Sequence, residues 1–125
     1  MSHQLQALAR RAVACKGWRW MPGMRTVERG TKLQHTHRLG DARRANWPEE
    51  YDWPHSLGLC LPDLADPATL GCLLALVREA WSFPHAHCYT VGARRWAVSI
   101  NGGSEFLGVW STEAEALVVA LEAAP

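Results

Sequence analysis

The strongest constraint on the fold is a pair of helices with clear boundaries in the second half of the chain. Asp66 followed by Pro67 is a favoured helix start, because aspartate caps free N–H groups and proline suits the first helical position. The apolar residues that follow form one stripe at helical spacing: Leu70, Leu73, Leu74, Val77 and Trp81. The run Thr112-Glu113-Ala114-Glu115 is a capping box that opens another helix, which extends to about Ala123.

Three short strands are predicted between these helices, at residues 87–91, 96–100 and 105–110. Gly92-Ala93-Arg94 joins the first two, and Asn101-Gly102-Gly103 is a strong hairpin signal between the last two. The first half is predicted to begin with a helix capped by Ser2 and ended at Lys16-Gly17. A hairpin then pairs residues 24–28 with 32–38.

The resulting order is α-β-β-(loop)-α-β-β-β-α, which predicts an α+β fold with helices packed on an antiparallel sheet. We expect one domain over residues 1–125, the usual size of a single domain. Within it, residues 1–38 hold the first helix and hairpin, and residues 66–125 form an αβββα unit. Residues 39–65 are an irregular connection, because Gly40, Pro48, Pro54 and Gly58 interrupt any long helix or strand.

The composition favours a folded cytosolic protein. Hydrophobic residues make up 48% of the chain and charged residues 20%, so a core can form. No apolar run approaches the ~20 residues that a membrane-spanning helix needs, and the first residues lack the pattern of a secretory signal. The cysteines form no close pair and are expected to be small core residues: Cys15, Cys60, Cys72 and Cys88.

The charge is divided unevenly along the chain. Residues 1–62 hold ten Lys or Arg and five Asp or Glu, which gives +5, whereas residues 63–125 hold three and seven, which gives −4; the sum is the net charge of +1. A basic half favours an anionic partner, and the alternative is a solvated surface with uneven charge.

Two stretches resemble a known group of proteins. They are Asp66-Pro67-Ala68-Thr69-Leu70-Gly71-Cys72-Leu73-Leu74-Ala75-Leu76-Val77-Arg78-Glu79-Ala80-Trp81 and Thr112-Glu113-Ala114-Glu115-Ala116-Leu117-Val118-Val119-Ala120-Leu121-Glu122-Ala123-Ala124. Together they resemble small bacteriophage and prophage proteins, including those of the phage ABA-sandwich domain. The resemblance covers about residues 60–125 and transfers no catalytic or binding residue. It implies a phage setting, in which small non-enzymatic proteins often act on host machinery.

Two His-x-His pairs are the sharpest chemical signal. His35 with His37, and His85 with His87, place two imidazoles on one face of a strand, where they can share a zinc ion. Their spacing matches no standard zinc module, so we expect no cofactor and keep a small zinc protein as the third interpretation. No nucleophile, phosphate-loop or metalloprotease motif occurs in the sequence, and we therefore expect no enzymatic activity.

The predicted partner-binding site is the segment from Arg38 to Trp53, which joins the last residue of the hairpin to the first part of the irregular connection. It combines arginine with tryptophan and tyrosine, the residue types that dominate interface hot spots: Arg38, Arg43, Arg44, Trp47, Tyr51 and Trp53. Trp18 and Trp20 share one face of a predicted strand, where they either fill the core or, beside nearby arginines, bind single-stranded nucleic acid.

The sequence thus predicts a non-enzymatic binding protein of phage or prophage type. The expected partner is a host protein or a protein–nucleic acid complex, and the leading specific role is inhibition of CRISPR or another defence system. Weak nucleic-acid contact and self-association are further expectations, and no membrane partner is expected. The main alternative is a regulatory protein that binds nucleic acid through the basic N-terminal half.

Overall fold

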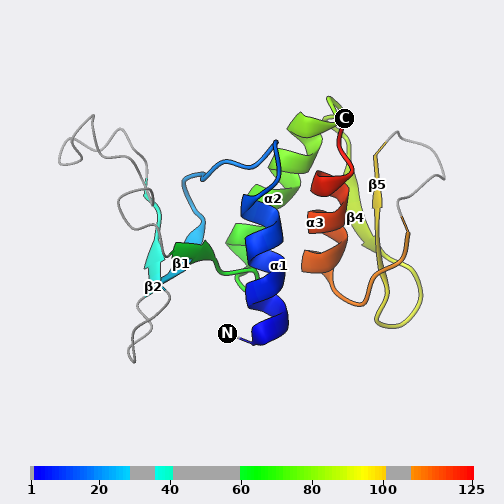
Figure 1. The fold of residues 1–125 in the computed structure, drawn as a ribbon. Coiled ribbons are helices and arrows are strands. Elements are labelled where there is room, and N and C mark those ends of the chain that lie inside the picture. The colour runs from blue at the N-terminus through cyan, green and yellow to red at the C-terminus, as the bar shows by residue number, and fades with distance from the viewer. Residues whose placement is uncertain (1, 29–35, 41–59, 101–107) are drawn as a thin grey trace.

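The computed structural model describes residues 2–28, 36–40, 60–100 and 108–125. It places a layer of helices between two small antiparallel sheets (Figure 1). The helices are α1 (His3–Val13), α2 (Pro67–Ala80) and α3 (Glu113–Glu122). The strands are β1 (Arg25–Glu28), β2 (Thr36–Arg38), β3 (Cys60–Pro62), β4 (His87–Thr90) and β5 (Trp96–Ser99).

Each helix begins at the cap that the sequence predicted. The Ser2 hydroxyl accepts a hydrogen bond from the N–H of Leu5 at 3.1 Å, and the Thr112 hydroxyl accepts one from Glu115 at 3.1 Å. The carboxylate of Asp66 accepts one from the N–H of Thr69 at 3.0 Å. Because these side chains satisfy N–H groups that the helix leaves free, the three starts are fixed by local sequence alone.

The three helices run in the same direction (Figure 1). Their C-terminal ends meet around one shallow pocket, which is lined by Lys16 beyond α1, Glu79 of α2 and Glu122 of α3. Parallel helices align their dipoles, so this end of the layer is negative. The basic residues in the last turns of α1 and α2, among them Arg11 and Arg78, compensate for that charge.

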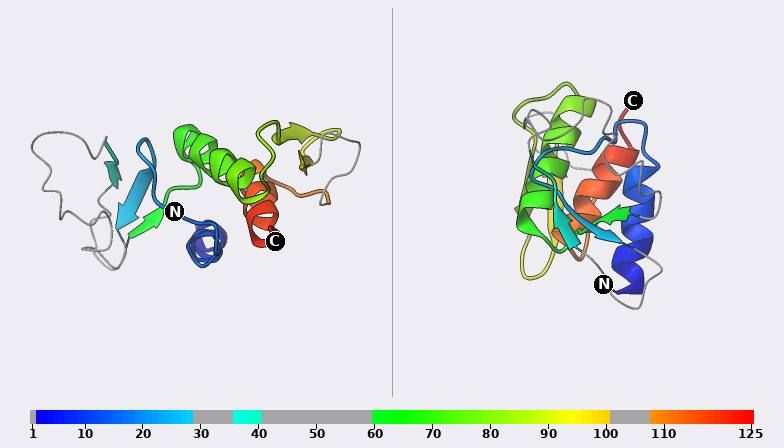
Figure 2. Two further views of the ribbon diagram at one scale, coloured as in Figure 1. Left: turned by 90° about the horizontal axis from the view of Figure 1, so that it is seen from above. Right: turned by 90° about the vertical axis from the view of Figure 1, so that its left-hand side faces the viewer.

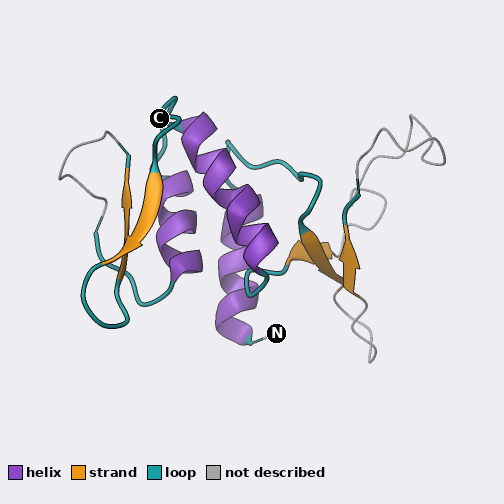
Figure 3. Ribbon diagram, turned by 180° about the vertical axis from the view of Figure 1, so that it is seen from behind, coloured by secondary structure: helices purple, strands orange, loops and turns teal. Residues whose placement is uncertain are grey.

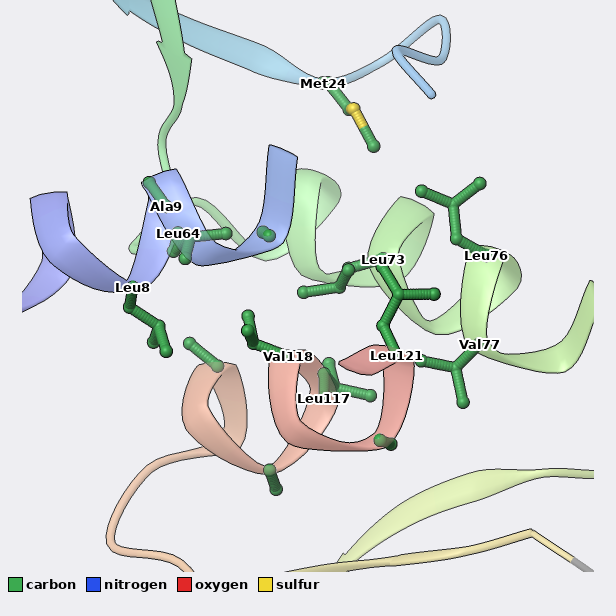
Figure 4. Packing of buried hydrophobic residues seen from close by; sticks show 14 of the residues in the cluster. Leu8, Ala9, Met24, Leu64, Leu73, Leu76, Val77, Leu117, Val118 and Leu121 are labelled. Carbon is green, nitrogen blue, oxygen red and sulfur yellow. The ribbon is translucent and has the colours of Figure 1, made fainter. Parts of the chain in front are cut away.

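The core lies between the helices, and α3 is at its centre (Figure 4). This helix packs on α1, on α2 and on the sheet of β4 and β5. Its buried residues therefore cover more than half of its circumference: Ala114, Ala116, Leu117, Val118, Ala120 and Leu121. The alanines allow close approach of the neighbouring elements, and the larger side chains of Leu117, Val118 and Leu121 are buried between them.

The first sheet has the order β2-β1-β3, with both pairings antiparallel. In β1 the neighbours Thr26 and Val27 are both buried, so both faces of this strand are covered. Strand β3 was predicted to be irregular, because three residues are too few to show alternation. Its last residue, Pro62, suits an edge strand, since proline cannot donate to a ladder.

The second sheet consists of β4 and β5. The strands predicted at 87–91 and 96–100 are confirmed with slightly shorter bounds. Of the third, residues 105–107 lie outside the described part. Trp110 forms a bridge with Trp96 through reciprocal backbone hydrogen bonds of 2.7 and 2.8 Å. This bridge continues the sheet beyond β5.

The α+β class is confirmed, but the strands form two sheets instead of one. Figure 2 shows the sheets on opposite sides of the helices, and Figure 3 shows the same arrangement from behind. All strands of the first sheet precede α2 along the chain, and both strands of the second sheet follow it. Because α3 packs on α1, on α2 and on the second sheet, it is covered from several sides, and the helices rather than a sheet form the centre.

Candidate functional site

The structure describes one of the six predicted partner-contact residues, Arg38. The other five lie outside the described residues: Arg43, Arg44, Trp47, Tyr51 and Trp53. Their contact with a partner stays a prediction. Arg38 is the last residue of β2, so its surroundings show how the chain is held where the irregular connection begins.

Arg38 is fixed at a junction between the first sheet and the start of α2. Its two terminal nitrogens pair with both carboxylate oxygens of Asp66, and the Nη2–Oδ1 distance is 2.8 Å. Nη1 also donates to the backbone carbonyl of Gly23 at 2.9 Å. A two-point arginine–carboxylate pair fixes orientation as well as distance. The guanidinium thus joins β2 to α2 and to the residues before β1.

The Asp66 carboxylate is the centre of this junction. Besides Arg38, it accepts hydrogen bonds from the N–H of Thr69 at 3.0 Å and from its hydroxyl at 2.8 Å. The Thr69 oxygen in turn accepts one from the backbone N–H of Arg25 in β1, also at 2.8 Å. The Arg38 guanidinium and, secondarily, Thr69 hold the pKa of Asp66 well below its usual range, although partial desolvation acts in the opposite direction. This carboxylate therefore stays ionised and serves as a structural anchor.

Sequence reasoning identified Asp66 as a helix cap but missed its pair with Arg38. The two residues are separated by 28 positions, and nothing in the spacing of either motif indicates the contact. The signal for this contact that the sequence offered was the overall charge pattern, because a basic half and an acidic half of one chain attract each other when they fold together.

The described part of the chain contains four ion pairs, and each joins the basic half to the acidic half. They are Arg11–Glu122 at 2.6 Å, Arg19–Glu79 at 2.5 Å, Arg25–Asp63 at 3.7 Å and Arg38–Asp66. Much of the described positive charge that predicted an anionic partner is thus compensated within the molecule. Four other basic residues have neither an ion pair nor a side-chain hydrogen bond with this part of the chain: Arg10, Lys16, Arg94 and Arg95.

The histidine pairs are only partly described. His35 lies outside the described residues, and His37 lies in β2. His85 precedes β4, and its backbone carbonyl accepts a hydrogen bond from Nδ1 of His87 at 3.2 Å. Residues 2–28, 36–40, 60–100 and 108–125 contain no group of three or more His, Cys, Asp or Glu side chains arranged to hold a metal.

Three of the thiols are held in the protonated form. Burial, aided by the nearby charge of Glu113, raises the pKa of Cys88 to about 12. Burial also raises the pKa of Cys15 and of Cys72. Since the thiolate is both the nucleophile and the metal ligand, these three cysteines are poor candidates for either role.

Trp18 and Trp20 pack against the core. Their rings meet edge to face, with centroids 5.4 Å apart, and both are partly buried. The indole N–H of Trp18 is buried and has no hydrogen-bond partner among the described residues, whereas that of Trp81 donates to the carbonyl of Ala120 at 2.8 Å. Packing against the core is therefore the role that the structure gives to Trp18 and Trp20.

Comparison of this chain with known proteins finds no relative. The chain matches no protein-family model, no curated protein and no solved structure. The resemblance to phage proteins stays a prediction. Within the described residues, no helix is both long enough and apolar enough to span a bilayer.

Proposed function

We propose that this chain is a non-enzymatic binding protein that contacts a partner protein through the segment between β2 and β3. The observation that supports this proposal is the anchoring of both ends of the segment in one sheet. β2 and β3 lie on either side of β1, about 10 Å apart by ordinary strand spacing, and the segment leaves β2 opposite Arg25 and enters β3 opposite Glu28, so its ends are held at the two ends of β1. Binding residues are often found on loops that a rigid scaffold positions.

The end at β2 is held most firmly. Leu39 is buried, and its backbone exchanges hydrogen bonds of 2.8 Å with Met24 and Gly23. Arg38, next to it, is fixed to Asp66. We therefore assign Arg38 a scaffold role and place the contacts with a partner on Arg43, Arg44 and Trp47, together with Tyr51 and Trp53.

The narrower role is inhibition of a host process, such as CRISPR or another defence system, by a phage or prophage protein in the host cytoplasm. This part rests on the resemblance of the α2 and α3 sequences to phage proteins. Nucleic-acid binding through the basic half is disfavoured, because four described arginines of that half are paired with acidic residues. The zinc alternative is not supported by the described residues, because they contain no cluster of His, Cys, Asp or Glu side chains that could hold a metal.

A triple variant, Arg43→Ala, Arg44→Ala and Trp47→Ala, tests the proposal. Tagged wild-type protein captures its partner from host cells, and binding is then measured with both proteins purified. We expect the variant to lose at least ~2 kcal/mol of binding free energy with little change in melting temperature. Arg10→Ala with Lys16→Ala is the matched control, since it removes two unpaired charges elsewhere.

Three outcomes would contradict the proposal. A folded triple variant that binds like wild type would show that the site is elsewhere. A sharp fall in melting temperature for Trp47→Ala or Trp53→Ala would show that the segment belongs to the core. Tight, sequence-specific binding of purified oligonucleotides at physiological salt would favour the nucleic-acid alternative.

A further inference from the structure

The sheet of β4 and β5 has one face toward the core and one face away from it. Val98 belongs to the buried core, and Cys88 and Trp96 pack against it. Since side chains alternate along a strand, His87 and Tyr89 lie on the opposite face. Their register partners Ser99 and Ala97 are small and buried, so the two rings carry the exposed surface of this face.

The two rings form a small preorganised platform. Their centroids are 5.4 Å apart and their planes are inclined by 40°. His87 is exposed and Tyr89 is partly buried. The hydrogen bond from Nδ1 of His87 to the carbonyl of His85 fixes the orientation of the imidazole. A ligand that stacks on these rings thus meets at least one side chain that is already held in place.

Positive charge adjoins this platform at the β4–β5 turn. The N–H of Val91 donates to the carbonyl of Arg95 at 2.8 Å, which continues the β4–β5 register and places Arg95 diagonally from Tyr89 on the same face. Arg94 is next to it in the turn. Both arginines are exposed and have no ion pair or side-chain hydrogen bond with the described residues. Residues 81–100 contain no Asp or Glu, so nothing in this stretch compensates for their charge.

We propose that this face binds a short stretch of single-stranded nucleic acid, with bases on His87 and Tyr89 and phosphates on Arg94 and Arg95. Aromatic rings at a surface beside arginines are the arrangement that such sites use, because every base can stack and every nucleotide carries a phosphate. An acidic peptide would use the arginines but would leave the ring pair without a role. This surface is separate from the segment between β2 and β3, so the proposed nucleic-acid binding can be tested independently of the proposed function.

The test is fluorescence anisotropy of the full chain with a labelled single-stranded oligonucleotide at several salt concentrations. Tyr89→Ala is expected to weaken binding at least fivefold, as for the loss of one stacked base, whereas Tyr89→Phe keeps the ring and should bind like wild type. Replacing Arg94 and Arg95 with Gln should reduce the slope of log affinity against log salt by about 0.7 for each phosphate that is no longer neutralised.

Arg10→Gln with Lys16→Gln is the matched control, because these are the other two basic residues with neither an ion pair nor a side-chain hydrogen bond in the described part. This control should leave affinity unchanged. Equal losses in the control and in the Arg94/Arg95 variant would overturn the proposal in favour of nonspecific attraction. Binding of a polyglutamate peptide as tight as that of the oligonucleotide, and unaffected by Tyr89→Ala, would overturn it in favour of an acidic protein partner. No binding at low salt by folded wild-type protein would also overturn it.

Discussion

Thr69→Val tests the junction that holds the first sheet to α2. The Thr69 side chain is fully buried, and its hydroxyl donates to Asp66 and accepts from the backbone N–H of Arg25, both at 2.8 Å. Valine keeps the shape and the branched β-carbon but removes both hydrogen bonds. One lost hydrogen bond costs about 1 kcal/mol, and depriving the partly buried N–H of Arg25 of this acceptor costs about 1 kcal/mol more. We therefore expect Thr69→Val to lower the free energy of unfolding by about 2 kcal/mol.

Thr69→Ser is the matched control, because it keeps the hydroxyl and removes only a methyl group. Its expected cost is about 1 kcal/mol, the value of one buried methyl group. Urea unfolding followed by tryptophan fluorescence gives both free energies. An unchanged slope of the unfolding free energy against urea concentration would show that the unfolded state is unaffected. If the valine variant proves more stable than the serine variant, hydrophobic packing and not the polar junction dominates at this position, and the reasoning is refuted.

Two further predictions concern acid and metal. The depressed pKa of Asp66 means that its ion pair contributes full stability above the ordinary value of 3.8 and loses it as the pH falls further, toward the folded-state pKa. Unfolding free energies measured between about pH 7 and about pH 2 should therefore fall less steeply at the acid end for Asp66→Asn than for wild type, and parallel profiles would contradict this. Excess chelator should leave the melting temperature unchanged and elemental analysis should find no stoichiometric zinc; the opposite result would direct mutagenesis to His35, His37, His85 and His87.

The elements that the sequence predicted well are those whose signals are local. The caps at Ser2, Asp66 and Thr112 lie within three residues of the groups that they satisfy, so each helix start could be predicted from a few letters. The strands β4 and β5 were likewise predicted from local signals, since Gly92-Ala93-Arg94 marks the turn between them. β3 was missed because three residues give no periodicity, and its partner in the sheet is more than thirty positions away, as the pairing of Glu28 with Cys60 shows.

The site depended on contacts that the sequence does not encode locally. The ion pair of Arg11 with Glu122 spans nearly the whole chain, and that of Arg38 with Asp66 crosses from a strand to a helix. The division into a basic and an acidic half was visible in the sequence, but it was interpreted as a signal for an external partner. Likewise, His87 was considered as a metal ligand, although its ring neighbour is Tyr89 on the same face. Which residues meet across elements became clear only with the register of the strands.

The parallel direction of the helices has a consequence for how the chain reaches its folded state. Helices that point the same way cannot be joined by a tight turn, so the chain must return to the starting end before each new helix begins. The two sheets provide these return paths, one between α1 and α2 and the other between α2 and α3 (Figure 1). The packing of α1 on α3 therefore closes a loop of about a hundred residues, and contacts of such separation slow folding. We expect refolding in milliseconds to seconds instead of the microseconds typical of antiparallel helical bundles, with docking of α1 as a late step.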